Sequence, residues 1–100
     1  MAKPVLLTSN AKNDLDFVTL YLFENWSLTV LKNFLALYEA KIRIIAEHPT
    51  RYPFIHQASG LRKAVLTKHN IILYREKPEH IEIISLFDTR QDPERVNRLV

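Results

Sequence analysis

Hydrophobic residues follow two different spacings in the first part of the chain, and each spacing predicts one kind of element. A short apolar run at residues 5–8, closed by the turn and cap residues Ser9 and Asn10, predicts a strand. From Ala11 to about Glu24, apolar residues recur every three or four positions, as on one face of a helix. That face is formed by Ala11, Leu15, Val18 and Leu22, widened by Tyr21. The chain is therefore expected to begin with a strand and an amphipathic helix.

A second helix is predicted between Ser27 and Pro49. Ser27 can cap its first turn, and Pro49 ends it because proline lacks an N–H and clashes with the preceding turn. The apolar positions again follow the three-and-four spacing, and they are Leu31, Phe34, Leu35, Tyr38, Ile42 and Ile45. Because only residues 25–27 separate the two helices, we expect an antiparallel hairpin, with Trp26 covering the end of the core.

The second half of the chain has the pattern of a β-sheet. Residues 50–59 are polar and interrupted by proline, so they are expected to form an irregular connection. Three strands are predicted at residues 61–66, 71–75 and 80–87, joined by turns short enough for an antiparallel meander. The last strand is apolar on both sides, which is typical of a central strand. The predicted fold is one α+β domain over residues 1–100, in the order β-α-α-β-β-β, with the sheet packed on the helix hairpin.

Composition excludes several classes of chemistry. The 100-residue chain has no cysteine, which removes disulfides, thiol nucleophiles and cysteine-based metal sites and makes a reducing cytoplasm the expected compartment. Gly60 is the only glycine, so a glycine-rich phosphate-binding loop cannot form and no cofactor is expected. The start of the sequence has no signal-peptide pattern, and no run of about 18 apolar residues occurs. Neither export nor membrane association is therefore expected.

Motifs for metal binding or hydrolysis are absent from the sequence. The histidines lack the short spacing of a metal site, so no metal is expected and they are interpreted as surface residues: His48, His56, His69 and His80. No serine lies in a nucleophile elbow. Two acidic pairs, Asp14 with Asp16 and Glu82 with Asp88, are interpreted as helix-start and surface charges.

Positive charge is concentrated in the second half of the chain. The whole net charge of +3 lies in residues 51–100, since the basic and acidic side chains of residues 1–50 balance. The predicted meander could bring several of these cations onto one rim that binds an acidic partner or nucleic acid. They could equally be a solvated sheet edge whose lysines discourage pairing with other sheets. The residues concerned are Arg62, Lys63, Lys68, His69, Arg75 and Arg90.

Several local motifs occur in a fixed order along the chain and end with Arg-Gln-Asp-Pro at residues 90–93. The others are Val5-Leu6-Leu7-Thr8-Ser9, Ala46-Glu47-His48-Pro49, Leu61-Arg62-Lys63, Ile72-Leu73-Tyr74 and Ile81-Glu82-Ile83-Ile84. Together with the order of the predicted elements, they resemble the RelE/ParE toxin superfamily of bacterial type II toxin–antitoxin systems. The resemblance covers nearly the whole chain, and the Arg-Gln-Asp-Pro ending is common among ParE-like members.

Two activities follow from this resemblance, and the C-terminus distinguishes them. RelE-like members cleave mRNA in the ribosome, using basic residues and a Tyr or His near the C-terminus for acid–base chemistry. ParE-like members inhibit DNA gyrase by binding. No Tyr or His follows Phe87, and residues 71–73 lack the arginine expected in the nucleases. The resemblance therefore implies a ParE-like toxin with no catalytic residue. The runner-up is an endoribonuclease acting through Arg62, Lys63, His69 and Arg90, and a non-toxic nucleic-acid- or protein-binding module is a further alternative.

The resemblance also implies a protein partner. Antitoxins of this superfamily typically wrap the toxin with an acidic extended or helical segment, so a hetero-oligomer of toxin and antitoxin is expected. The basic meander and the exposed sides of the aromatic-rich helices would supply the surface that meets the antitoxin or the target. The candidate residues are Arg62, Lys63, Lys68, His69, Arg75, Arg90, Asp92, Phe17, Phe23 and Tyr38.

Overall fold

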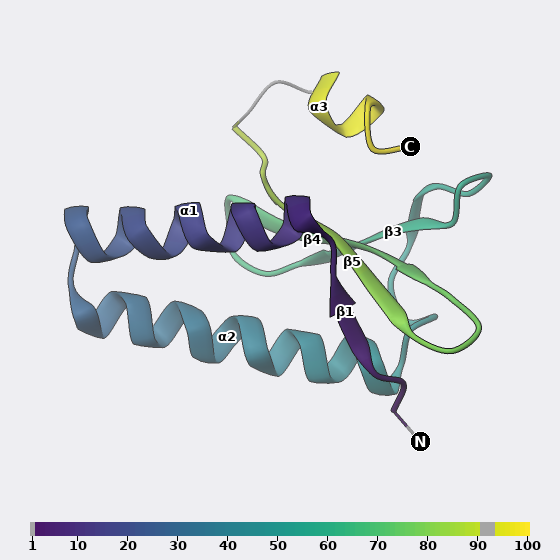
Figure 1. The fold of residues 1–100 in the computed structure, drawn as a ribbon, viewed down its shortest axis with the longest axis horizontal. Helices are drawn as coiled ribbons and strands as arrows, with labels where there is room; N and C mark the ends of the chain where they lie inside the picture. The colour runs from purple at the N-terminus through teal and green to yellow at the C-terminus, as the bar shows by residue number, and fades with distance from the viewer. Residues whose placement is uncertain (1, 91–93) are drawn as a thin grey trace.

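Two long helices and a five-stranded sheet make up most of the computed structural model, which describes residues 2–90 and 94–100 (Figure 1). In chain order the elements are β1 (Val5–Leu7), α1 (Ser9–Asn25), α2 (Leu28–Glu47), β2 (Phe54–His56), β3 (Leu61–Val65), β4 (Asn70–Glu76), β5 (Ile81–Asp88) and α3 (Glu94–Asn97). The predicted α+β class is confirmed. The predicted order of a strand, a helix hairpin and a meander is confirmed as well.

Side-chain caps begin both long helices. Ser27 caps α2 as predicted, because its hydroxyl accepts a 3.1 Å hydrogen bond from the N–H of Val30. The cap of α1 is Thr8, whose hydroxyl accepts a 3.1 Å hydrogen bond from the N–H of Ala11. The first strand is therefore one residue shorter than predicted, and the helix starts earlier, since Ser9 already lies within α1.

The strands are ordered β1-β5-β4-β3-β2 across the sheet. The first strand pairs with β5 in parallel, and all other pairs are antiparallel. The central position predicted for the last strand is confirmed, since β5 lies between β1 and β4 and residues 83–87 are all buried. Helices α1 and α2 pack on one face of the sheet, and the short α3 lies against the other.

The connection at residues 50–59 is not wholly irregular, and this part of the prediction was wrong. Residues 54–56 form β2, which pairs with β3 at the edge of the sheet. Pro53 precedes this edge strand, where its missing N–H breaks no ladder, and its carbonyl accepts a 3.1 Å hydrogen bond from the N–H of Lys63. A strand of three residues depends on its neighbour for stability, and local sequence carries little signal for it.

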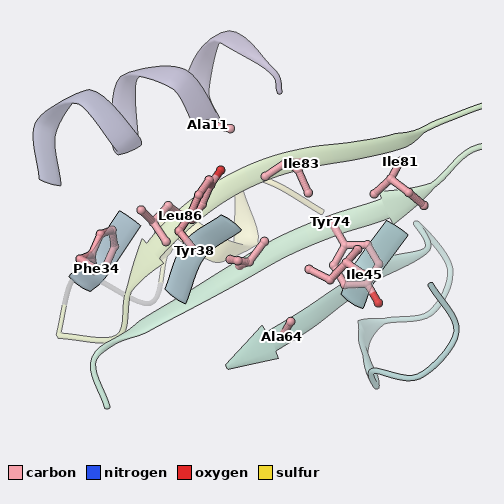
Figure 2. Packing of buried hydrophobic residues seen from close by; sticks show 10 residues of the cluster. Ala11, Phe34, Tyr38, Ile45, Ala64, Tyr74, Ile81, Ile83 and Leu86 are labelled. Carbon is pink, nitrogen blue, oxygen red and sulfur yellow. The ribbon is translucent and has the colours of Figure 1, made fainter. Parts of the chain in front are cut away.

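Buried side chains form one cluster on each face of the sheet. The larger cluster joins the helices to the sheet and contains Ala11, Phe34, Tyr38, Ile45, Ala64, Ile72, Tyr74, Ile81, Ile83 and Leu86 (Figure 2). The smaller cluster lies under α3 and contains Leu61, Leu73, Ile84 and Phe87. Tyr38 belongs to the larger cluster and is only 7% exposed, so its predicted place on a partner-binding surface is wrong. Its position on the apolar stripe of α2 decides its burial.

The hydroxyl of Tyr74 lies inside the larger cluster and donates a 2.7 Å hydrogen bond to the carbonyl of Pro49. Burial is the main cause that raises the pKa of Tyr74 from 10.0 to about 12, and the nearby Arg62 lowers it in part. The folded state favours the neutral phenol, so burial of Tyr74 stabilises the fold fully below pH 10, the pKa of tyrosine in the unfolded chain. This stabilisation is lost as the pH rises through about 12, the pKa in the folded state.

We therefore expect the free energy of unfolding to fall by about 2–3 kcal/mol between these two pH values. Urea unfolding at several pH values, with a tyrosinate absorbance titration, measures the effect. Tyr74→Phe should lose the hydrogen bond to Pro49 and show a flatter pH dependence. An equally steep decline in this variant would show that Tyr74 is not the group responsible.

Candidate functional site

Exposed aromatic and aliphatic side chains cover α1 and the bend that follows it. Phe17 is 68% exposed and Phe23 is 60% exposed, in agreement with their prediction as surface residues. We call this region the aromatic surface, and it consists of Phe17, Leu20, Tyr21, Phe23, Trp26 and Leu28. Trp26 is exposed as well, so it does not cover the end of the core as predicted. Glu24 is the only charged residue between positions 17 and 28. Groups of exposed apolar side chains are typical of surfaces that bind other proteins.

A cleft runs beside this surface, between α1 and the end of β5. It consists of two adjoining hollows of about 360 and 260 Å³, both lined by Phe17, Val18 and Asp88. We call it the α1 cleft. The first hollow is the more polar of the two and adds Asn10, Asn13, Asp14, Leu86 and Arg95. The second is more apolar and adds Tyr21, Leu22, Phe34, Asn70 and Arg90. A partner bound there would meet an apolar wall and charged groups together.

The Asp14 side chain connects α1 to β5 and to the C-terminal segment. One carboxylate oxygen accepts hydrogen bonds of 2.7 Å from the Ser85 hydroxyl and 3.1 Å from the N–H of Leu86. The other accepts a 2.5 Å hydrogen bond from Arg95. The Asp14 side chain is only 10% exposed, so its interpretation as a simple helix-start charge was wrong.

A sequence signal for this burial existed. Asp14 lies three residues after Ala11 and four before Val18, so the helical spacing places it on the stripe that faces the sheet. A carboxylate on a buried stripe must find donors or a cation. The unrecognised donors come from β5 and from the C-terminal segment, which are far from Asp14 in the sequence.

Arg90 and Asp88 form an ion pair at the second hollow. Two nitrogens of Arg90, Nε and Nη2, donate to the two carboxylate oxygens of Asp88 at 3.0 and 2.8 Å. These hydrogen bonds hold the pKa of Asp88 below its usual range, so it stays ionised in weak acid. His69 lies nearby, since its carbonyl accepts a 2.8 Å hydrogen bond from the N–H of Thr89. Of the predicted residues, the structure brings together Arg90, His69 and Phe17 around this end of the sheet.

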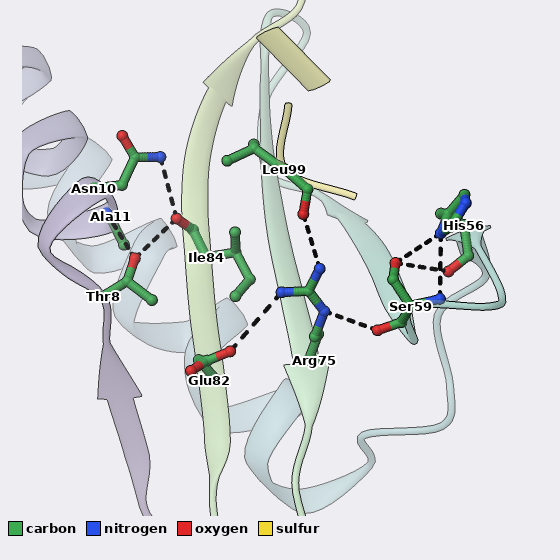
Figure 3. Close-up of polar contacts among 9 residues, drawn as sticks. All are labelled: Thr8, Asn10, Ala11, His56, Ser59, Arg75, Glu82, Ile84 and Leu99. Atoms are coloured by element: carbon green, nitrogen blue, oxygen red, sulfur yellow. Dashed lines mark hydrogen bonds and ion pairs between the residues drawn. The ribbon is translucent and has the colours of Figure 1, made fainter. Parts of the chain in front are cut away.

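Two of the predicted basic residues are engaged in holding the fold. The guanidinium of Arg62 stacks on the ring of Phe54, 3.8 Å from its centre, and donates to the carbonyl of Tyr52 at 2.6 Å. Arg75 donates to the carbonyls of Ser59 and Leu99, each at 2.8 Å, and pairs with Glu82 at 3.9 Å (Figure 3). Both residues tie loops and the C-terminus to the sheet.

The predicted cations do not form one rim. Arg62 and Lys63 are consecutive in β3, so their side chains point to opposite faces of the sheet. In the register of β4 and β5, Asn70 lies opposite Asp88 and Arg75 lies opposite Glu82. Arg75 is therefore five strand residues, or about 16 Å, from the end of the sheet that carries Arg90. Lys63 and Lys68 are exposed, on β3 and on the turn after it, while Asp92 lies outside the described residues.

The described part of the chain contains no arrangement of a known catalytic type. His56, the last residue of β2, and Ser59, in the turn that follows, lie 2.8 Å apart, but their contact is exposed and neither is hydrogen-bonded to an acidic side chain of the described residues. In residues 2–90 and 94–100, no three His, Asp or Glu side chains converge as a metal ion would require. No described helix is both long and apolar enough to cross a bilayer.

Sequence comparison identifies no relative: no protein-family model and no curated protein matches the chain. Solved structures do match. A chain of the chromosomal ParDE toxin–antitoxin system of P. aeruginosa superposes with a TM-score of 0.74 at 13% identity, covering 89% of this chain and 98% of that one. This fold of a helix hairpin on a five-stranded sheet is therefore shared with a toxin–antitoxin protein.

Two further structures support the same assignment of the fold. The toxin–antitoxin complex RelBE2 of Mycobacterium tuberculosis matches with a TM-score of 0.60 at 18% identity, over 88% of this chain and 99% of that one. A YoeB/ParE toxin of Agrobacterium tumefaciens matches with a TM-score of 0.63 at 14% identity, over 85% and 96%. The chain thus has the fold of the RelE/ParE toxins, as its sequence motifs predicted.

Proposed function

We propose that this chain is the toxin of a type II toxin–antitoxin system, that it acts in the cytoplasm by binding and inhibiting DNA gyrase, and that a cognate antitoxin neutralises it. The fold shared with ParE, RelE and YoeB toxins supports the toxin class. The observation that carries the choice of binding over catalysis is the aromatic surface beside the α1 cleft, which has the chemistry of a protein interface.

The positions of the basic residues argue against the nuclease alternative. An mRNA endonuclease needs cations and an acid–base group around one phosphate. Arg62 and Arg75 are bonded within the fold, and Arg90 is paired with Asp88. His69 lies at the opposite end of β4 from Arg75, so these groups do not converge on a common point. RNA cleavage through this set of residues would require a large rearrangement.

The antitoxin is proposed to occupy the aromatic surface and the second hollow of the α1 cleft. Phe17 and Tyr21 offer aromatic anchors, and apolar side chains from α1 and α2 line the floor between them and β5. Arg90 lines the same hollow, and its Nε and Nη2 bind Asp88. Because the Arg90 side chain is 64% exposed, its Nη1 can still meet an acidic residue of the antitoxin. An amphipathic acidic segment meets both requirements, and its binding gives a hetero-oligomer of toxin and antitoxin.

A supercoiling assay with purified gyrase tests the proposed target. We expect the chain to inhibit supercoiling at a concentration close to that of gyrase, since a binding inhibitor does not turn over. If the antitoxin is added before the toxin, supercoiling should proceed without inhibition. Full gyrase activity at a large excess of the correctly folded chain would contradict the proposed target.

A further inference from the structure

Helix α2 is apolar on two sides. Its inner side packs into the larger cluster through Phe34 and Tyr38. Its outer side carries Val30, Leu37 and Ile44, which recur every seven residues and therefore fall on one stripe along the helix. Val30 is 37% exposed and Leu37 is 52% exposed, and α2 lies at the outer edge of the fold (Figure 1). A helix that is apolar all round is normally covered on both sides, so the outer stripe lacks a covering partner.

A shallow hollow of about 370 Å³ lies on this outer side and is lined by Asn33, Ala36, Leu37 and Ala40. Two of these residues are alanines, so a second helix can approach closely there. Leu37 is an exposed large side chain at the wall of the hollow. One surface thus carries both a large apolar side chain and the space for one. We call this surface the α2 face, and it consists of Val30, Asn33, Ala36, Leu37, Ala40 and Ile44.

Two opposite charges lie beside the α2 face. Lys32 and Glu39 are also seven residues apart, so the helical spacing places them on one flank, next to Ala36. Both residues are exposed, and neither forms an ion pair with another residue in the described ranges 2–90 and 94–100. A flank with one cation and one anion two turns apart is complementary to the same flank of an antiparallel copy.

An antiparallel pair of α2 helices with its twofold axis at Ala36 satisfies the apolar and the charged groups together. Lys32 lies four residues before the axis and Glu39 three residues after it. Lys32 of one copy and Glu39 of the other then differ by about 1.5 Å in height along the helices, and the symmetry forms this pair twice. In the same arrangement Leu37 is level with the stretch between Asn33 and Ala36 of the second copy, which is part of its hollow.

We propose that two copies of this chain pair through their α2 faces, antiparallel, with Leu37 of each copy in the hollow of the other. The partner is a second copy because one face carries both members of each contact, as a twofold interface requires. No residue of the α2 face lines the α1 cleft, so each dimer presents two such clefts. A pair of 20-residue helices is a small interface, and we expect a Kd of about 10 µM. The pairing does not depend on the proposed toxin activity.

Sedimentation equilibrium of the purified chain tests the pairing, over roughly 1–200 µM to bracket the expected Kd. The chain should form dimers, and Leu37→Asp should weaken them at least about 50-fold, because the dimer contains this contact twice. Leu20→Asp is the matched control, since Leu20 is 56% exposed but lies on α1 in the aromatic surface. We expect it to change the Kd less than about threefold. A wild-type chain that stays monomeric, or an equal loss in Leu20→Asp, would overturn the proposal.

Exchanging the two charges tests the antiparallel arrangement. Lys32→Glu and Glu39→Lys should each weaken the dimer about tenfold, because each change places like charges opposite one another at both symmetric positions. The double variant restores opposite charges and should return to within about threefold of the wild-type Kd. Lys12→Glu is the control for net charge, since Lys12 is an exposed lysine on α1. A double variant as weak as the single ones, or equal weakening in Lys12→Glu, would overturn the proposed arrangement.

Discussion

Replacing Phe17 by aspartate is expected to weaken binding of the proposed antitoxin by about 100-fold. Phe17 lines both hollows of the α1 cleft, and it is the most exposed side chain of the aromatic surface. Aspartate removes an aromatic anchor and places a carboxylate where an apolar contact would form. Titration calorimetry of the variant with the antitoxin measures the effect.

Leu37→Asp is the matched control for this substitution. Leu37 is also a large apolar residue, 52% exposed, but it lies on α2 and outside the α1 cleft. It borders a separate shallow hollow with Asn33, Ala36 and Ala40. We expect this variant to change the affinity less than about threefold. Equal losses in the two variants would place the antitoxin elsewhere on the helix hairpin.

Ile83→Ala should lower the free energy of unfolding by about 3–4 kcal/mol and the Tm by roughly 15–25 °C. Ile83 is fully buried in β5, where it pairs with Leu7 of β1 and Tyr74 of β4. Truncation leaves a cavity in β5, which pairs in parallel with β1 on one side and antiparallel with β4 on the other. Calorimetric melting measures the loss.

The neighbouring strand provides a control for this truncation. Leu6 lies in β1 with its side chain more than half exposed, so Leu6→Ala removes the same number of carbon atoms from a position near water. We expect its cost to stay below about 1 kcal/mol. A comparable cost for both variants would show that the burial in β5 does not determine stability.

The parts of the fold that the sequence predicted are those set by local signals. Ser27 caps α2, and the helix ends at Glu47 just before Pro49, because caps and prolines act within a few residues. The alternation and length of the apolar runs located the meander in the same way. β2 and α3 were not predicted, because three or four residues form an element only where the rest of the fold supports them.

The site was harder to predict than the fold. Composition pointed to the cations of the second half, yet Arg62 and Arg75 turn inward to bind backbone carbonyls of loops that sequence alone could not place. Phe17 and Phe23 were correctly placed on the surface, whereas Tyr38 was not. Asp14 was missed because its partners, Ser85 and Arg95, come from the far end of the chain.

A shared fold does not decide an activity. The fold supplies a sheet and a helix hairpin, and function then depends on the side chains that they carry. In this chain Val96 and Leu99 pack on the smaller cluster of the sheet face opposite the helices, and the exposed apolar side chains of the aromatic surface lie on the hairpin. This distribution is suited to binding proteins through the hairpin and the α1 cleft.

Expression of the chain in bacteria that lack the antitoxin is the most direct test of the proposed function. Plasmid supercoiling and the integrity of translated transcripts are measured in the same cells at the onset of growth arrest. The account predicts relaxed plasmid and intact transcripts, with both growth and supercoiling restored by co-expression of the antitoxin. Cleaved transcripts together with normal supercoiling would contradict it and would support the nuclease alternative.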